Sequence, residues 1–235
     1  MSMHQQMRTQ LSGQKGFTLI EIAIVLVIIG LLLGGVLKGQ ELINTARVRA
    51  LNNSVDGITA AWFSFQDRYR AFPGDYLDAR SQVNLPGAQA GGDGNGLVDT
   101  DAERGRVWTH LESAGYITGG YDGAAVTFDA YDCTVVTCPD NGFGSGMNLS
   151  HGTMNQDGGA DAHELLTGQG IPVDVLAELD RKVDDGAAIT GLMQVGIDSA
   201  GNWANAAACI EVAAPNESYE LQAPNDNCAA VFRNF

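Results

Sequence analysis

The sequence predicts an α+β protein in which a long N-terminal helix packs on a globular head built around a small antiparallel sheet, with extra short helices and loops. Two hydrophobic patterns predict the helix, one over 17–37 and one over 38–72. Short strand patterns separated by Gly, Asn and Asp predict the sheet within 73–235. We therefore expect a membrane-spanning helix, its amphipathic continuation and the head, in that order.

The membrane-spanning part is an apolar run from Phe17 to Leu37. Its 21 residues contain a single charged side chain, Glu21. A helix of this length rises about 30 Å, which matches the hydrocarbon core of a membrane. Because an ionised carboxylate is costly inside a membrane, Glu21 is a candidate functional residue that needs a cationic partner.

The second part of the helix is amphipathic. Its apolar residues recur at spacings of three and four, which places them on one helical face. Pro73 and Gly74 predict that the helix ends near Ala71. We expect the head to cover this face, whose residues are Leu51, Val55, Ile58, Trp62, Phe65 and Tyr69.

The elements predicted within the head are short. Thr100 and Glu103 have capping-box spacing, which predicts a helix that Gly115 closes. A second helix is expected over 172–185. The predicted strands cover 124–129, 189–197, 209–212 and 219–222.

Two further segments of the head have a predicted character. Residues 142–159 are rich in Gly and Asn and are interpreted as a mobile loop. Asp180, Asp184 and Asp185 are interpreted as the solvated end of the second head helix.

Acidic residues dominate the charge of the chain. There are 28 Asp and Glu against 13 Lys and Arg, a formal net charge of −15. Binding to nucleic acid depends on Lys and Arg at the phosphates, so we expect no direct nucleic-acid binding. A cation is a more natural small ligand for this chain than an anion.

One acidic segment is a possible calcium site. Asp93, Asn95, Asp99 and Asp101 place hard oxygen ligands at alternate positions around glycines. The match to an EF-hand is incomplete, because Arg104 stands where the twelfth-position Glu belongs. The alternative is an Asp/Asn/Gly turn held by side-chain-to-backbone hydrogen bonds.

Four cysteines lie outside the apolar run, and they allow three pairings. We favour Cys133 with Cys138 and Cys209 with Cys228, because each pair is close in sequence. Disulfides persist in an exported domain. Zinc is the alternative, but neither pair has the C-x₂-C spacing of structural zinc sites.

Patterns typical of catalysis are weak. The segment 142–146 is not G-x-S-x-G, because Phe143 stands in the place of the first Gly. His151, His163 and Glu164 could supply a base and an acid, but nothing in their spacing orders them. We therefore do not expect an enzyme.

Gly16 followed by Phe17-Thr18-Leu19-Ile20-Glu21 and the apolar run, behind a short basic leader, resembles the N-terminus of type IV prepilins and the related pseudopilins. The resemblance implies that a prepilin peptidase removes the leader, residues 1–16, by cutting between Gly16 and Phe17. The same enzyme would methylate the new amino group of Phe17. Glu21 would pair with the amino terminus of a neighbouring subunit as that subunit enters a filament.

The resemblance also implies partners and a location. The chain would be a pilin, minor pilin or pseudopilin of a type IV pilus or a type II secretion-like filament. Its partners would be the peptidase/methyltransferase, other pilin-like subunits and an inner-membrane assembly platform. It would cross the inner membrane once, with the head outside the cytoplasm, and later join a periplasmic or cell-surface filament. The loop between Cys209 and Cys228 is similar to the disulfide-closed loop of many pilins.

Two alternatives stay open. A plain single-pass anchor would leave Glu21 unexplained. A membrane-tethered binding or adhesin domain would never polymerise, and replacing Glu21 would then leave its activity unchanged.

Overall fold

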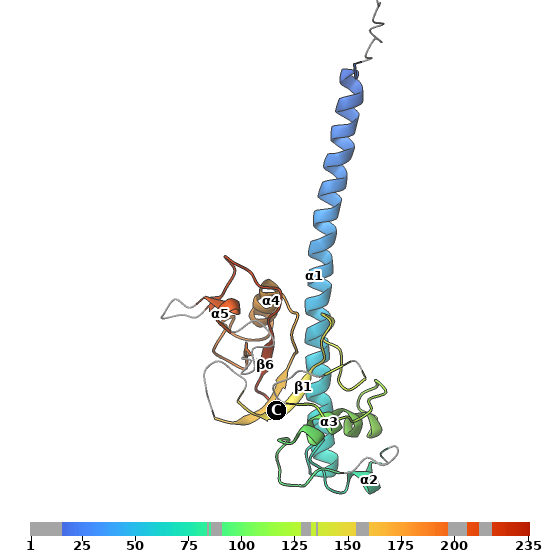
Figure 1. Ribbon diagram of the computed structural model, residues 1–235, viewed down its shortest axis with the longest axis vertical. Helices are drawn as coiled ribbons and strands as arrows, with labels where there is room; N and C mark the ends of the chain where they lie inside the picture. The colour runs from blue at the N-terminus through green and yellow to red at the C-terminus, as the bar shows by residue number, and fades with distance from the viewer. Residues whose placement is uncertain are drawn as a thin grey trace, which may run out of the picture. The chain divides into compact units, whose positions relative to one another are not determined.

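The computed structural model describes residues 16–83, 85, 91–127, 133–134, 136–153, 160–196, 206–211 and 218–235 (Figure 1). The backbone divides into two compact units, Met1–Ile43 and Asn44–Phe235. Residues 44–69 of the first helix thus belong to the unit that contains the head, whereas the sequence pattern starts the head at 73.

Helix α1 (Leu19–Tyr69) has 51 residues and is about 77 Å long at 1.5 Å per residue. No proline interrupts it. Its end lies two residues before the predicted one, because Arg70 adopts a left-handed conformation with φ 54°. Among the described residues, Arg70 alone has a positive φ without being glycine. This conformation cannot continue a right-handed helix.

The predicted apolar stripe of α1 is confirmed as part of the core of the 44–235 unit. Leu51, Val55, Ile58, Trp62 and Phe65 are all buried. Tyr69 is partly buried and packs against the same core. The spacing of three and four therefore identified the face that the head covers.

The strands of the head form two antiparallel sheets, which confirms the α+β class. The larger sheet has the order β1-β2-β6-β3, so β6 pairs with both β2 and β3. The smaller sheet pairs β4 with β5. The strands are β1 (Asn148–Gly152), β2 (Ala162–Leu166), β3 (Met193–Val195), β4 (Ile210–Glu211), β5 (Ser218–Tyr219) and β6 (Ala230–Phe232).

Four short helices complete the described part of the head. The capping box predicted for α3 (Asp101–Ser113) is present, with reciprocal hydrogen bonds between Thr100 and Glu103. Gly115 follows α3 with φ 82°, the left-handed conformation expected at a helix end. The other helices are α2 (Ala79–Gln82), α4 (Val173–Val183) and α5 (Ala206–Cys209).

The interpretation of Asp180 as part of a solvated helix end is wrong. Asp180 lies in the last turn of α4 and its side chain is 0% exposed. Tyr219 of β5 donates a hydrogen bond from its hydroxyl to Asp180 Oδ2 at 2.9 Å. The packing of β5 against α4 thus buries the carboxyl of Asp180, although the neighbouring sequence indicates an exposed position.

Two other expectations for the head are wrong. Residues 124–127 form no strand, because the Val126 amide donates to the carbonyl of Asp101 at the start of α3 instead of joining a sheet. Residues 128–129 lie outside the described residues. The expected mobile loop contains β1, which pairs with β2 from Asn148↔Leu166 to Gly152↔Ala162; residues 154–159 lie outside the described residues.

The structure contains the two disulfides that proximity in sequence favours. Cys133 is joined to Cys138, and Cys209 is joined to Cys228. All four side chains are buried. The second disulfide connects the end of α5 to the segment just before β6, and so closes a loop around β4 and β5.

Carboxylates fix several loops of the head by accepting backbone hydrogen bonds. Glu112, near the end of α3, accepts the amides of Gly119, Gly120 and Tyr121 at 2.6–3.2 Å. Burial acts to raise the pKa of Glu112, but these three hydrogen bonds outweigh it and the pKa is lowered from 4.5.

We predict that Glu112→Gln lowers the free energy of unfolding at pH 7 by about 1–2 kcal/mol, because an amide NH₂ cannot accept a hydrogen bond. The pKa of Glu112 is lower in the folded chain than in the unfolded chain. The carboxylate therefore stabilises the fold fully at pH values above the unfolded-state pKa, and this stabilisation is lost as the pH falls through the folded-state pKa. Denaturant unfolding at pH 7 and pH 3 should show a difference at pH 7 that shrinks at pH 3. Glu178→Gln, which removes an exposed pair with Lys182, is the control and should change little.

His163 connects β2 to other parts of the core. Its ring lies 4.5 Å from that of Phe72 and 5.3 Å from that of Trp62. Its Nε2 accepts the amide of Val98 at 3.2 Å, which requires an unprotonated Nε2. Burial, and secondarily the charge of His151, lowers the pKa of His163 to about 4.

We predict that His163 makes the free energy of unfolding fall as the pH is lowered from about 6.5, the ordinary pKa of histidine, to about 4, the pKa of His163 in the folded chain. The unfolded chain binds the proton first in this window, so stability falls as pH falls. His163→Gln keeps an acceptor for Val98 but should flatten this loss, at a cost of about 1–3 kcal/mol at pH 7.5 from the lost ring contacts. Urea unfolding at several pH values checks both effects. An unchanged slope between pH 6.5 and 4 would contradict the assignment.

Candidate functional site

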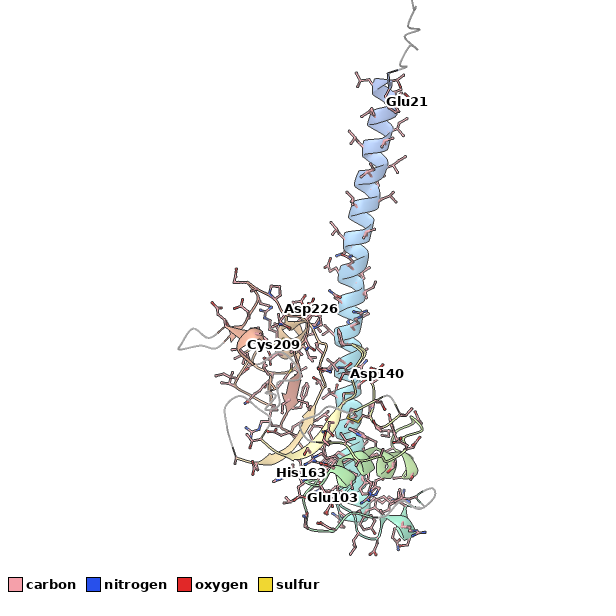
Figure 2. The ribbon with its side chains drawn as sticks, in the orientation of Figure 1. Glu21, Glu103, Asp140, His163, Cys209 and Asp226 are labelled. Carbon is pink, nitrogen blue, oxygen red and sulfur yellow. A yellow bond between two sulfur atoms is a disulfide. The ribbon has the colours of Figure 1, made fainter. Side chains whose placement is uncertain are left out.

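The candidate assembly site lies at the start of α1, where the described chain begins with Gly16. Phe17 is 84% exposed. Figure 2 shows Glu21 on the first turn of the helix. The predicted cleavage bond between Gly16 and Phe17 therefore lies in an exposed segment without regular secondary structure, just before the helix.

Thr18 and Glu21 form a capping box at this helix start. The backbone amide and the hydroxyl of Thr18 both donate to Glu21 Oε2 at 2.8 Å. The amide of Glu21 donates back to the Thr18 hydroxyl at 3.3 Å. These bonds satisfy groups that a helix N-terminus leaves open, and a negative charge there is favoured by the helix dipole.

The capping box leaves one oxygen of Glu21 available. Glu21 Oε2 accepts both bonds from Thr18, and no donor is bound to Oε1 in the described part of the chain. A single carboxylate can thus order its own helix through one oxygen and accept a second donor through the other. We did not predict a role for Thr18 from the sequence, although T-x-x-E spacing is the signature of a capping box.

The apolar surface around Glu21 has no cover within its own unit. Helix α1 is long and apolar enough to cross a membrane, and none of its most apolar 18-residue window is buried. Gly30, Gly34, Gly35 and Gly39 have nothing within 4 Å of the position a side chain would take. Such a surface needs lipid or other helices around it, and the glycines allow close helix packing.

The residues predicted for calcium are held by other partners. Asn95 Nδ2 lies 3.3 Å from Asp93 Oδ2 and 3.5 Å from Asp99 Oδ2, so an amide group bridges these two carboxylates. Asp101 Oδ1 accepts a hydrogen bond from Arg104 at 2.5 Å. Calcium at this segment stays a prediction.

Asp93 instead approaches two acids that are not among the four residues predicted to bind calcium. One oxygen each of Asp75, Asp93 and Glu103 lies within 4.8 Å of the others. The two oxygens of Glu103 accept the amides of Asp93 and Thr100. The two oxygens of Asp93 accept the backbone and side-chain amides of Asn95.

Asp75 is the buried member of this cluster. Its Oδ1 accepts the amides of Gly94 and Asn95 at 2.7 and 3.1 Å, and its Oδ2 accepts the amide of Gly96 at 3.0 Å. Burial raises the pKa of Asp75, and these amides act against the rise. Every oxygen of the cluster is thus engaged by N–H groups, and the carboxylates hold the 93–96 turn in place.

The residues considered for catalysis contact other groups of the fold in and around the larger sheet. His163 accepts the amide of Val98, and its ring lies 5.1 Å from the ring of His151. Glu164 is buried and pairs with Arg233 at 3.0 Å. The structure places His151 on β1 and both His163 and Glu164 on the neighbouring strand β2.

Comparison with known proteins bears on the N-terminal segment. Residues 11–37 match the family model described as the prokaryotic N-terminal methylation motif. This match covers the predicted cleavage site, Glu21 and the apolar run. Comparison with curated proteins and with solved structures finds no match. The chain therefore carries, at residues 11–37, the type IV prepilin-like signature.

Proposed function

We propose that this protein is a structural subunit of a type IV pilus or a type II secretion-like filament, and not an enzyme. A prepilin peptidase/methyltransferase cuts between Gly16 and Phe17 and methylates Phe17. Before assembly, the mature subunit is anchored in the inner membrane with its head outside the cytoplasm. An assembly platform then transfers it into a filament of pilin-like subunits at the cell surface or in the periplasm.

The observation that carries the proposal is the placement of Glu21. It is the single charge in an apolar helical segment that nothing in its own unit covers. A simple membrane anchor does not need the charge of Glu21, because a charged side chain makes membrane insertion less favourable. In a filament the charge of Glu21 can have a function, because the amino group of Phe17 in a neighbouring subunit neutralises it only when the two helices are in one axial register.

The capping box supports this role. With Oε2 bound to Thr18, the carboxylate has a fixed orientation and Oε1 is open to a donor from outside the helix. A misplaced neighbour would leave a charge unpaired among apolar side chains, which costs several kcal/mol. The pairing thus selects the correct docking position while the apolar stems supply most of the contact area.

The head is proposed to form the outer surface of the filament. The 44–235 unit has its own core and two disulfides, as expected for a domain outside the cytoplasm. Pilin, minor pilin and pseudopilin all fit this arrangement. The competing function is a tethered binding or adhesin domain, which would use the same head without polymerising.

We predict that Glu21→Ala leaves membrane insertion intact but reduces incorporation into sheared filaments by at least about tenfold, because the register-setting pair is lost. Immunoblots of membrane and sheared-filament fractions check this. The matched control is Glu41→Ala, which removes an exposed acid paired with Lys38 at 2.6 Å on the same helix and should assemble normally. Unchanged incorporation of Glu21→Ala, or a wild-type protein absent from every filament fraction, would favour the tethered domain.

We also predict that the mature protein begins at N-methylated Phe17. Intact-mass and peptide mass spectrometry of the protein from its native host tests this, with reductant added to count the disulfides. A chain that still begins in the leader, or that is cut after Leu37, would contradict the filament proposal.

A further inference from the structure

Asp180 is a buried carboxyl whose hydrogen bonding is incomplete. Its Oδ2 accepts the Tyr219 hydroxyl at 2.9 Å. Its Oδ1 is shielded from solvent, and no described residue donates a hydrogen bond to it. Buried polar atoms almost always have a partner, and an exception points to a water or an ion at the site.

Two more carboxylates approach this position. One oxygen each of Asp180, Asp184 and Asp185 lies within 4.8 Å of the others. Asp184 Oδ2 accepts the amides of Leu192 and Met193 at the start of β3. These bonds fix Asp184 beside α4, so three acids converge where α4, β3 and β5 meet.

Asp185 is the solvent-exposed member of the group. It is held by the Ala187 amide at 2.9 Å and the Thr190 hydroxyl at 2.6 Å. The nearby Lys182 is paired with Glu178 at 2.5 Å. Its ammonium group is therefore engaged on the helix surface, and three negative charges converge at the end of α4.

The other acid cluster of the described chain differs in this respect. All six oxygens of Asp75, Asp93 and Glu103 accept hydrogen bonds from N–H groups. That cluster is complete without a ligand. The Asp180 cluster has an unsatisfied oxygen in its most buried member.

The pKa of Asp180 reflects its burial. Burial raises the pKa of Asp180 to about 6, and Asp185 and Asp184 add to the rise against the Tyr219 hydroxyl and the nearby Gly186 amide. The raised pKa is consistent with a carboxyl that is enclosed by the fold next to two other acids.

We propose that Asp180, Asp184 and Asp185 bind a divalent cation, with calcium as the best match. The group offers only carboxylate oxygens, which suit calcium, and has none of the nitrogen or sulfur ligands that zinc prefers. The exposed side at Asp185 leaves room for water to complete the coordination. This site would join α4, the start of β3 and the disulfide-closed loop that carries Tyr219. The inference does not rest on the filament role.

The test is whether calcium stabilises the full chain in detergent. Thermal unfolding is measured at pH 7.5, once in EDTA and once in about 10 mM calcium. This concentration is well above the dissociation constants of extracellular calcium-binding modules. We expect calcium to raise the melting temperature of the wild type by about 3 °C or more. Asp180→Asn should abolish this shift. Asp93→Asn, in the saturated cluster, should retain it.

A second readout separates cation binding from a packing defect. Asp180→Asn keeps an acceptor for Tyr219 and removes the buried charge, so in EDTA it should be at least as stable as the wild type. Isothermal titration should give one calcium per chain for the wild type and at least about tenfold weaker binding for Asp180→Asn, because ligand charge sets affinity. The proposal is overturned if calcium produces no shift, or if the shift survives Asp180→Asn.

Discussion

Burial of one face of α1 is the interaction on which the rest of the head depends. Trp62 shows why, because its ring contacts Phe72, His163 and Phe235 at centroid distances of 5.2, 5.3 and 6.0 Å. These three rings come from the turn after α1, from β2 and from the segment after β6. One helical residue therefore joins parts of the chain that are far apart in sequence.

The acidic composition has a second role besides surface charge. Glu112, Asp75 and Asp184 each accept two or more backbone amides from a loop elsewhere in the sequence. A glycine-rich loop has many amides and few side chains to order it, and an ionised carboxylate is a strong acceptor. Much of the head is held in shape by these bonds, and its negative charge is partly a consequence of how its loops are fixed.

Local patterns predicted the parts of the structure that local interactions determine. The apolar stripe of α1, the Thr100–Glu103 capping box and the left-handed Gly115 that follows α3 all depend on residues within a few positions of each other. The strands β1 and β2 were missed because their side chains are largely buried on both faces, so polar residues do not alternate with apolar ones. The segment 124–127 has strand-like composition, but the amide of Val126 bonds to α3.

The site residues divide in the same way. Glu21 was predictable because a lone charge in an apolar run is visible in the sequence itself. Asp75 and Asp180 were not predictable, because their partners lie about 20 and 39 positions away and only the tertiary fold brings them together. Thr18 was overlooked although its spacing to Glu21 carried the signal.

The position of β6 in the sheet sets the order in which the head can fold. Strand β6 follows β1, β2 and β3 in sequence, yet it pairs with β2 on one side and β3 on the other. Among the described residues, β6 supplies the backbone hydrogen bonds that connect the β1–β2 pair to β3. The β1–β2 pair can form before β6, but the complete four-stranded sheet needs the last strand of the chain. The sheet is therefore complete only when nearly the whole chain is available, which makes its assembly a late step in folding.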